Sequence, residues 1–139
     1  MNTITFIVKH HLENNKNIFS SYSQTKYINV YKMGVPVYIF IVPYRARESF
    51  KNLYINHMPW ILEDEKEPYE IIFSHQNDKQ PFNRGAMKNL GFWYARQKYP
   101  NNYKQINFIF QDIDTIPGNK GLLNFKTTKG IVKHYFGFN

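Results

Sequence analysis

The stretch VPVYIFIVPYRAR, residues 35–47, decides the fold. Its first part, Val35–Val42, is rich in β-branched and aromatic residues, which predicts a buried strand. Pro43 cannot donate to a β-ladder, so the strand should end there. From about Ala46 the spacing of apolar residues becomes helical, because the next apolar positions fall close to one helix face. These positions are Phe50, Leu53, Tyr54, Met58 and Ile61.

Pro59 should kink or end this first helix early. The chain beyond the helix repeats the pattern of strand and helix. A second strand is predicted over Tyr69–Ser74, and a second helix from about Asn83 to Lys98, with Asn83 as its N-cap. A third strand is predicted over Ile106–Phe110. The order is therefore strand, helix, strand, helix, strand.

This order predicts an α/β fold with a mainly parallel sheet, right-handed crossovers and flanking helices. In such sheets ligands bind beyond the carboxyl ends of the strands. Three polar segments leave those ends, residues 43–47, 74–84 and 111–115. We therefore expect all three segments to meet in one crevice.

The length of 139 residues suggests one domain. Residues 35–139 form that domain in our interpretation, and residues 1–34 form a poorly patterned leader. Within the leader, Thr3–Val8 is a candidate short strand, followed by a loop rich in Asn and Ser. Residues 122–139 are expected to hold one or two short strands.

Composition excludes several classes of protein. The chain has no cysteine, so it has no disulfide, thiolate metal site or cysteine nucleophile. Its aromatic content of 18% argues against disorder. No apolar run approaches the roughly 18 residues needed to cross a bilayer, and the N-terminus does not resemble a signal peptide. We expect a cytoplasmic or otherwise soluble protein with no anchor.

The formal net charge of +8 raises the question of a nucleic-acid partner. The lysines are spread along the chain without a dense cluster, which favours an ordinary solvated surface. The arginines are more informative, because three of the four, Arg45, Arg47 and Arg84, lie in the polar segments of the crevice. A basic nucleic-acid-binding domain is kept as the last of three hypotheses, and no nucleic acid is expected as a partner.

The triplet Asp112-Ile113-Asp114 directly follows the third predicted strand. Residues two apart on a strand point to the same side, so both carboxylates can face the crevice while Ile113 points into the core. Paired carboxylates at this position suit Mg²⁺ or Mn²⁺, especially when phosphate oxygens complete the coordination. The alternative is a polar strand end that enters a turn.

The other two segments carry groups that suit a nucleotide. Arg45 and Arg47 stand at the start of the first helix, where guanidinium groups and backbone N–H groups can bind phosphate. Phe82 could lie against a base or ribose, and Arg84 could bind a nucleobase edge or a phosphate. The alternatives are exposed charges and a hydrophobic staple. Together with the carboxylate pair, the set favours a nucleoside diphosphate over a nucleic-acid strand.

Three runs, residues 39–47, 82–92 and 108–117, resemble the N-terminal half of the β-1,4-galactosyltransferase family in order and spacing. The likeness covers about residues 35–137. It implies a GT-A fold, which is Rossmann-like, here truncated on its C-terminal side. It also implies transfer of a sugar from a UDP-sugar, with UDP-galactose as the expected donor, to a glycan hydroxyl with inversion and usually with Mn²⁺.

The resemblance implies roles for individual residues. Asp114 should bind the metal, Mn²⁺ or alternatively Mg²⁺, with Asp112 as a further candidate ligand. The residues implied to surround the nucleotide-sugar are Pro43, Tyr44, Arg45, Arg47, Phe82, Arg84, Asp112 and Ile113. The family's acidic catalytic-base segment and its Met and His metal ligands have no counterpart here, so no catalytic residue is assigned.

From that departure we expect that UDP binds but that sugar transfer is weak unless another chain completes the site. The rival hypothesis is a catalytically inactive remnant or a partner subunit of a split glycosyltransferase. In both cases we expect self-association, or a partner chain, at the side of the sheet where later elements are missing.

Overall fold

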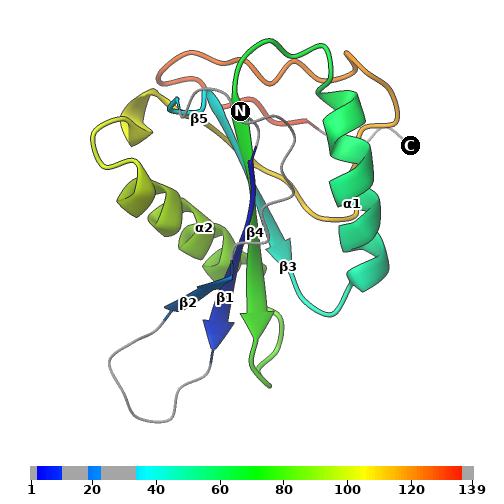
Figure 1. Ribbon diagram of the computed structural model, residues 1–139, viewed down its shortest axis with the longest axis vertical. Coiled ribbons are helices and arrows are strands. Elements are labelled where there is room, and N and C mark those ends of the chain that lie inside the picture. The colour runs from blue at the N-terminus through cyan, green and yellow to red at the C-terminus, as the bar shows by residue number, and fades with distance from the viewer. Residues whose placement is uncertain (1–2, 11–18, 23–33, 136–139) are drawn as a thin grey trace.

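The computed structural model describes residues 3–10, 19–22 and 34–135 (Figure 1). They form one five-stranded sheet in the order β2-β1-β4-β3-β5, with two α-helices and one short 3₁₀ turn, η1. The elements are β1 (Thr3–His10), β2 (Phe19–Tyr22), β3 (Tyr38–Tyr44), α1 (Glu48–Ile61), β4 (Tyr69–Asn77), α2 (Arg84–Lys98), η1 (Tyr103–Gln105) and β5 (Asn107–Phe110).

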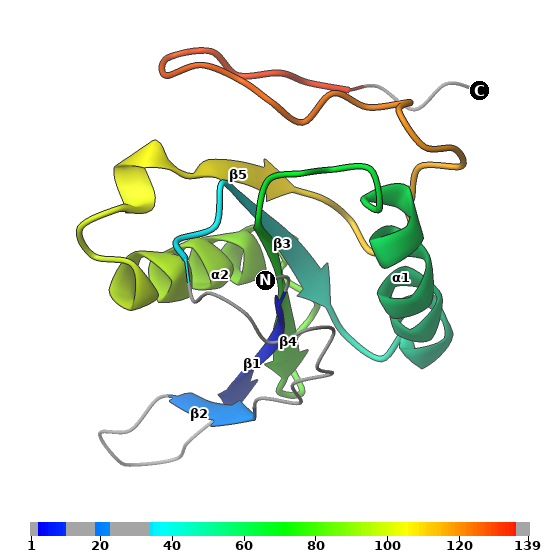
Figure 2. The same ribbon diagram turned by 45° about the horizontal axis from the view of Figure 1, so that its top comes forward.

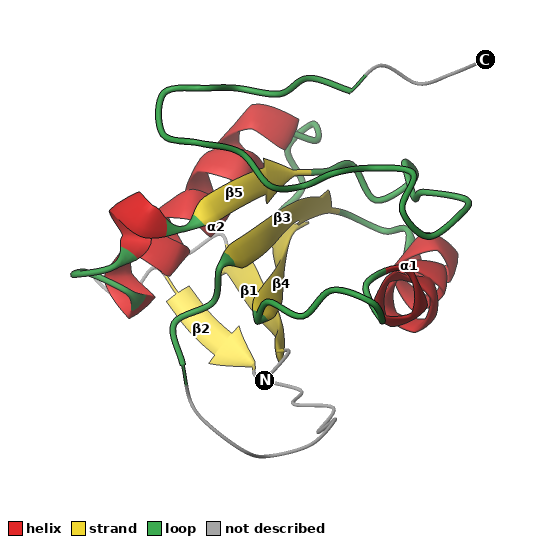
Figure 3. Cartoon of the chain, turned by 90° about the horizontal axis from the view of Figure 1, so that it is seen from above, coloured by secondary structure: helices red, strands yellow, loops and turns green. Residues whose placement is uncertain are grey.

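The strand β3 lies at the centre of the three strands that position the site. It pairs in parallel with β4 on one side and with β5 on the other. The crossovers through α1 and α2 therefore run in opposite directions, and right-handed connections place the two helices on opposite faces of the sheet (Figure 3). The predicted α/β class, a mainly parallel Rossmann-like GT-A sheet with flanking helices, is confirmed.

Burial on both faces of the sheet explains why the sequence of β3 is a nearly continuous apolar run. All seven of its residues are buried, as is usual for a strand covered by helices on both sides. Alternate residues of β3 face α1 and pack with Tyr54, Met58 and Ile61. The residues between them, Ile39 and Ile41, belong to the second core with Ala95 of α2.

Helix α2 approaches the sheet closely at Gly91. A Cβ atom at this position would lie 2.4 Å from Cγ2 of Ile41 and 2.6 Å from Oγ of Ser74. Both distances are shorter than carbon atoms can tolerate, so only glycine fits. This contact fixes the distance between α2 and strands β3 and β4.

The prediction that Pro43 ends the strand is wrong, and Pro59 does not end the first helix. Strand β3 continues through Pro43 to Tyr44, because the N–H that Pro43 lacks would point past the end of β5. The last β5 register pair is Ile41 with Phe110, and Ile41 uses its carbonyl on that side to accept from Gln111 N–H. Prolines are tolerated at such unpaired positions.

Helix α1 likewise continues through Pro59 to Ile61. The proline removes one intrahelical hydrogen bond, and its ring crowds the carbonyl four residues earlier. Met58 and Ile61, on either side of it, are buried in the core against β3, which holds the last turn in place.

The segment 1–34 contributes to the same sheet. The strand expected at Thr3–Val8 is present as β1, which pairs in parallel with β4 and antiparallel with β2. The Asn- and Ser-rich loop expected after it is contradicted at Ser20 and Ser21, which lie in β2, and residues 1–2, 11–18 and 23–33 lie outside the described residues. Residues 122–135 form irregular chain (orange to red in Figure 2), so the short strands expected there are absent from the part of that segment that the structure describes. No described helix is long and apolar enough to cross a membrane.

Candidate functional site

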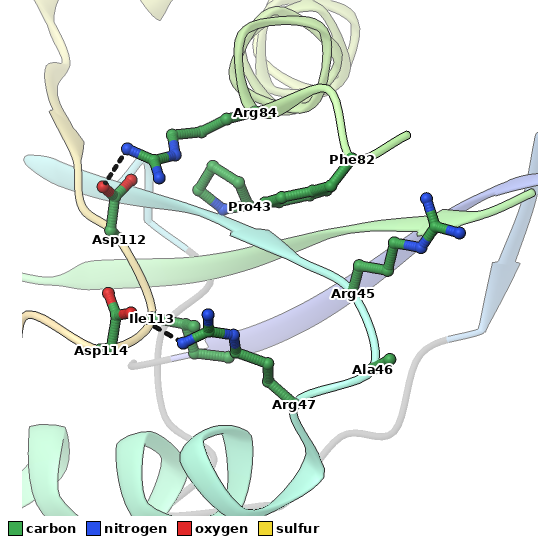
Figure 4. A pocket seen from close by; sticks show the side chains of 9 residues that line it. All are labelled: Pro43, Arg45, Ala46, Arg47, Phe82, Arg84, Asp112, Ile113 and Asp114. Atoms are coloured by element: carbon green, nitrogen blue, oxygen red, sulfur yellow. Dashed lines mark hydrogen bonds and ion pairs between the residues drawn. The ribbon is translucent and has the colours of Figure 1, made fainter. Parts of the chain in front are cut away.

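The loops that follow β3, β4 and β5 converge on one pocket of about 270 Å³ at the carboxyl ends of these strands. This is the edge at which the strand order reverses around β3, where open α/β sheets bind ligands. The pocket is lined by Pro43, Arg45, Ala46, Arg47, Phe82, Arg84, Asp112, Ile113 and Asp114 (Figure 4). Eight of these nine residues are among those singled out from the sequence.

An ion pair joins the first loop to the third. The Arg47 guanidinium donates a hydrogen bond of 2.8 Å to Oδ2 of Asp114 (Figure 4). Both side chains are roughly half exposed, at 52% and 43%. A pair this open to solvent contributes little to stability, so both groups are available to a ligand at small cost.

Asp112 is held more firmly, by two cations of helix α2. Arg84 lies 2.9 Å from Oδ2 of Asp112, and the Lys88 ammonium lies 3.3 Å from Oδ1. Oδ1 is buried and accepts no hydrogen bond from the described part of the chain. These two contacts direct the Asp112 carboxylate at the first turns of α2.

The two aspartates do not lie on a strand, because β5 ends at Phe110. A tight turn presents them instead, in which Thr115 N–H donates to the Asp112 carbonyl at 3.1 Å. Ile113 between them is buried in the core against β3 and α1, as expected. The two aspartates therefore line the pocket while Ile113 is buried, as was inferred for a strand. A turn produces this arrangement, and the buried Ile113 side chain anchors the turn.

A buried, hydrogen-bonded pair of side chains, Tyr54 and Gln111, holds that turn in place. Tyr54 Oη donates to Oε1 of Gln111 at 2.6 Å, and Nε2 of Gln111 donates to the Thr115 carbonyl at 2.5 Å. Burial raises the pKa of Tyr54 well above its ordinary value, so this hydroxyl remains a donor. Helix α1 thereby fixes the turn that carries both aspartates.

Arg45 and Arg47 do not act as one fork. Ala46 between them has a φ of 49°, in the left-handed region, and the two side chains diverge (Figure 4). Arg45 donates to the Gln80 carbonyl of the second loop and points away from the aspartates. It therefore links the first loop to the second, while Arg47 links the first to the third.

Tyr44 is the predicted site residue that does not line the pocket. Its side chain is only 2% exposed and its ring packs against Phe73 and His75. The alternation of β3 turns Tyr44 toward the core facing α1, as it does Val42. The ring of Tyr44 therefore faces the core and not the pocket.

A family model for the N-terminal region of glycosyl transferase group 7 matches residues 8–124. The chain belongs to the glycosyl transferase group 7 family. The match confirms the resemblance identified from the residues, and it begins inside the segment that was treated as a leader. No match is found among solved structures.

Relatives of this group 7 chain include galactosyltransferases from several mammals. It is 32% identical over 79 residues to β-1,4-galactosyltransferase 1 of Bos taurus, and 32% identical over 79 residues to β-1,4-galactosyltransferase 4 of Homo sapiens. It is 28% identical over 96 residues to β-1,4-galactosyltransferase 1 of Mus musculus. These matches cover 57%, 57% and 69% of this chain and 19%, 22% and 22% of the relatives, so the chain spans about a fifth of their length.

The donor set of the group 7 pocket suits a hard divalent cation. Asp112 and Asp114 supply carboxylate oxygens, and Oδ1 of Asp112 is buried without a hydrogen bond from the described residues. The described residues contain no cluster of three His, Cys, Asp or Glu side chains that could hold a metal. These two carboxylates are the residues of the pocket that could hold a cation such as Mn²⁺ or Mg²⁺, with its other ligands from water or phosphate.

Two residues of the site were missed by sequence reasoning. Lys88 lies four residues after Arg84, on the same face of α2, and that spacing is the signal that could have identified it. Gln76 is buried at the end of β4 and hydrogen-bonds the turn that carries Phe82. No local pattern marks Gln76, since its role depends on the path of the turn after it.

Proposed function

We propose that this chain binds a UDP-sugar together with a divalent metal, as the donor half of an inverting glycosyltransferase. The observation that carries the proposal is the convergence of two carboxylates and three guanidinium groups from three loops in one pocket. Family membership and the galactosyltransferase relatives support it, and UDP-galactose is the donor they favour.

The cations of the pocket would bind the diphosphate. Arg47 and Arg84 each engage an aspartate now, at 2.8 and 2.9 Å, and guanidinium groups bind phosphate oxygens with the same fork geometry. As the sugar–phosphate bond breaks, these groups would stabilise the charge that develops on the departing UDP. Phe82, 43% exposed at the rim, offers an apolar face to the uracil or ribose.

Asp114 is the residue proposed to hold Mn²⁺ or, alternatively, Mg²⁺. It has a single, solvent-exposed partner in Arg47, whereas Asp112 has both Arg84 and Lys88. Releasing Asp114 to a metal therefore costs less than releasing Asp112. The metal, when bound, would neutralise the diphosphate as a Lewis acid.

No general base is assigned. The two carboxylates of the pocket are both engaged by cations, and neither is a free proton acceptor for an acceptor hydroxyl. We therefore expect UDP binding rather than sugar transfer as the measurable activity of the isolated chain.

A partner subunit of a split glycosyltransferase is the second candidate. The observation that favours it is strand β5, which has β3 on one side and, among the described residues, no strand on the other. Phe110 at its end is 48% exposed. A second chain, or a second copy, at this edge would cover it and could supply the missing base.

Calorimetric titration with UDP, with and without Mn²⁺, tests the main proposal. We expect binding that requires Mn²⁺ and that Asp114→Asn removes, because the amide cannot replace an anionic ligand. Asp64→Asn, in the acidic turn after α1 and 80% exposed, is the matched control and should bind as wild type. Absence of UDP binding in both conditions, or binding unchanged by Asp114→Asn, contradicts the proposal.

A further inference from the structure

Gln76 is a buried glutamine at the carboxyl end of β4, only 2% exposed. Both ends of its amide are used. Nε2 donates to Oδ1 of Asp78 at 2.7 Å and to the Pro81 carbonyl at 3.1 Å, with a longer contact of 3.4 Å to the Gln80 carbonyl. Oε1 accepts from the Asn83 N–H at 2.8 Å.

Through these bonds the side chain of Gln76 contacts the turn after β4 at four residues, Asp78, Gln80, Pro81 and Asn83. Asp78 also accepts from the Gln80 N–H at 3.0 Å, which tightens the start of the turn. The Gln80 carbonyl accepts a second donor, the Arg45 guanidinium. Since burial of an amide without hydrogen-bond partners destabilises a protein, few other paths of this turn are compatible with a buried Gln76.

The end of the turn is the wall of the pocket. Asn83, whose N–H is held by Gln76, caps α2 by accepting from the Ala86 N–H at 2.9 Å. Phe82 precedes this cap and Arg84 follows it, and both line the pocket. The direction from which Arg84 meets Asp112 therefore depends on where Gln76 places the cap.

We propose that Gln76 is a positioning residue of the nucleotide site. It touches no pocket ligand itself, because it is not among the lining residues. It acts by fixing the Pro81 carbonyl and the Asn83 N–H, and so places Phe82 and Arg84 at the pocket. The identity of the ligand in this inference rests on the proposed function.

The substitution Gln76→Met tests the proposal, because methionine keeps the length and unbranched shape and removes the hydrogen bonds. We expect UDP affinity in the presence of Mn²⁺ to fall about tenfold, the cost of a misplaced charge-assisted hydrogen bond. Tyr99→Phe is the matched control. It removes a partly buried hydrogen bond of 2.8 Å to Glu70 at the opposite end of the same strand, and it should leave UDP affinity unchanged.

A double-mutant cycle with Arg84→Ala separates positioning from general loss of stability. If Gln76 acts through Arg84, the double variant should bind UDP about as weakly as Arg84→Ala alone. Losses that simply add would overturn the proposal, as would Gln76→Met binding as wild type. Should Gln76→Met fail to fold, Asp78→Ala removes one partner of the amide at the surface and is expected to weaken UDP binding in the same direction.

Hydrogen exchange at the Asn83 and Ala86 amides tests the positioning role without any ligand. Gln76→Met should speed exchange at both, while Tyr99→Phe should not. If the wild-type chain binds no UDP, the proposed function fails and this measurement alone decides the role of Gln76. Unchanged exchange at Asn83 and Ala86 in Gln76→Met overturns it.

Discussion

Two buried tyrosines in the core that faces α1 differ in how their hydroxyl groups are satisfied. Tyr54 Oη donates to Gln111 at 2.6 Å. Tyr44 Oη is buried and has no hydrogen-bond partner among the described residues. A buried hydroxyl without a partner costs about 1–3 kcal/mol of folding free energy, so the two residues should respond to loss of the hydroxyl in opposite ways.

We predict that Tyr44→Phe raises the free energy of unfolding by about 1 kcal/mol and that Tyr54→Phe lowers it by about the same amount. The first change removes an unsatisfied group, and the second leaves the buried Gln111 oxygen without its donor. Urea unfolding of both variants measures the two differences. A loss of stability in Tyr44→Phe would show that its hydroxyl is satisfied in solution.

The pH dependence of the Tyr54 effect has a definite sign. Burial raises the pKa of Tyr54 in the folded protein, whereas the unfolded chain ionises near its ordinary value of about 10. Above that pH the unfolded state binds fewer protons, so wild-type stability falls as pH rises. The deficit of Tyr54→Phe should therefore shrink by about 1.4 kcal/mol per pH unit.

Much of the candidate site could be predicted residue by residue. Arg47, Arg84 and Asp114 stand out because loops at the carboxyl ends of parallel strands lie at one edge of the sheet, and the alternation of strands and helices can be predicted from periodicity. The direction of single side chains could not be predicted in the same way. Arg45 diverges from Arg47 because Ala46 adopts a positive φ, and no residue type in that triplet indicates such a backbone.

At the scale of single elements, helix α2 offers two glycines with opposite surroundings. Gly91 touches Ile41 and Ser74, so a Cβ there would overlap both. Gly85 lies in the first turn, where a Cβ would meet only Oδ1 of Asn83 at an ordinary 3.7 Å. A side chain therefore has no room at position 91 but fits at position 85.

We predict that Gly91→Ala lowers the free energy of unfolding by about 1–3 kcal/mol, the usual cost of overpacking a core. It should also weaken UDP binding, because pushing α2 outward moves Arg84. Thermal or urea unfolding and calorimetry measure the two effects.

Gly85→Ala is the control and should stabilise the helix by up to about 1 kcal/mol, since alanine has the higher helix propensity. A Gly91→Ala variant as stable as wild type would mean that α2 lies further from the sheet than described.

The ends of β3 and α1 show why element boundaries were harder to predict than the elements themselves. The rules for Pro43 and Pro59 are local, and each counts only one lost hydrogen bond. At Pro43 no neighbouring strand requires that bond, and at Pro59 the burial of Met58 and Ile61 outweighs it. Both facts depend on residues distant in the sequence.

At the scale of the whole molecule, the sheet order could be predicted only in part. The order β4-β3-β5 is not fixed by the alternation of strands and helices, but the parallel pairing of these three strands follows from it. The place of β1 beside β4 does not, because their register pairs, from Thr3 with Glu70 to His10 with Asn77, join residues 67 positions apart. Neither composition nor periodicity indicates which strand accepts such a partner.

The free edge of β5 leads to a prediction about association. We expect the wild-type chain to self-associate at micromolar concentration through this edge, and Phe110→Lys to reduce association, because a charge on an edge strand opposes strand addition. Sedimentation velocity measures both. Leu53→Lys, on α1 and 53% exposed, is the control and should associate as wild type. A clean wild-type monomer contradicts the prediction.

The contact between Arg47 and Asp114 has a thermodynamic consequence for the proposed site. A phosphate on Arg47 would free Asp114 for a cation, and a cation on Asp114 would free Arg47 for a phosphate. Each ligand must then raise the affinity of the other by the same factor, because binding free energies are reciprocally coupled. The pocket would respond steeply when both ligands arrive together and only weakly to either one alone.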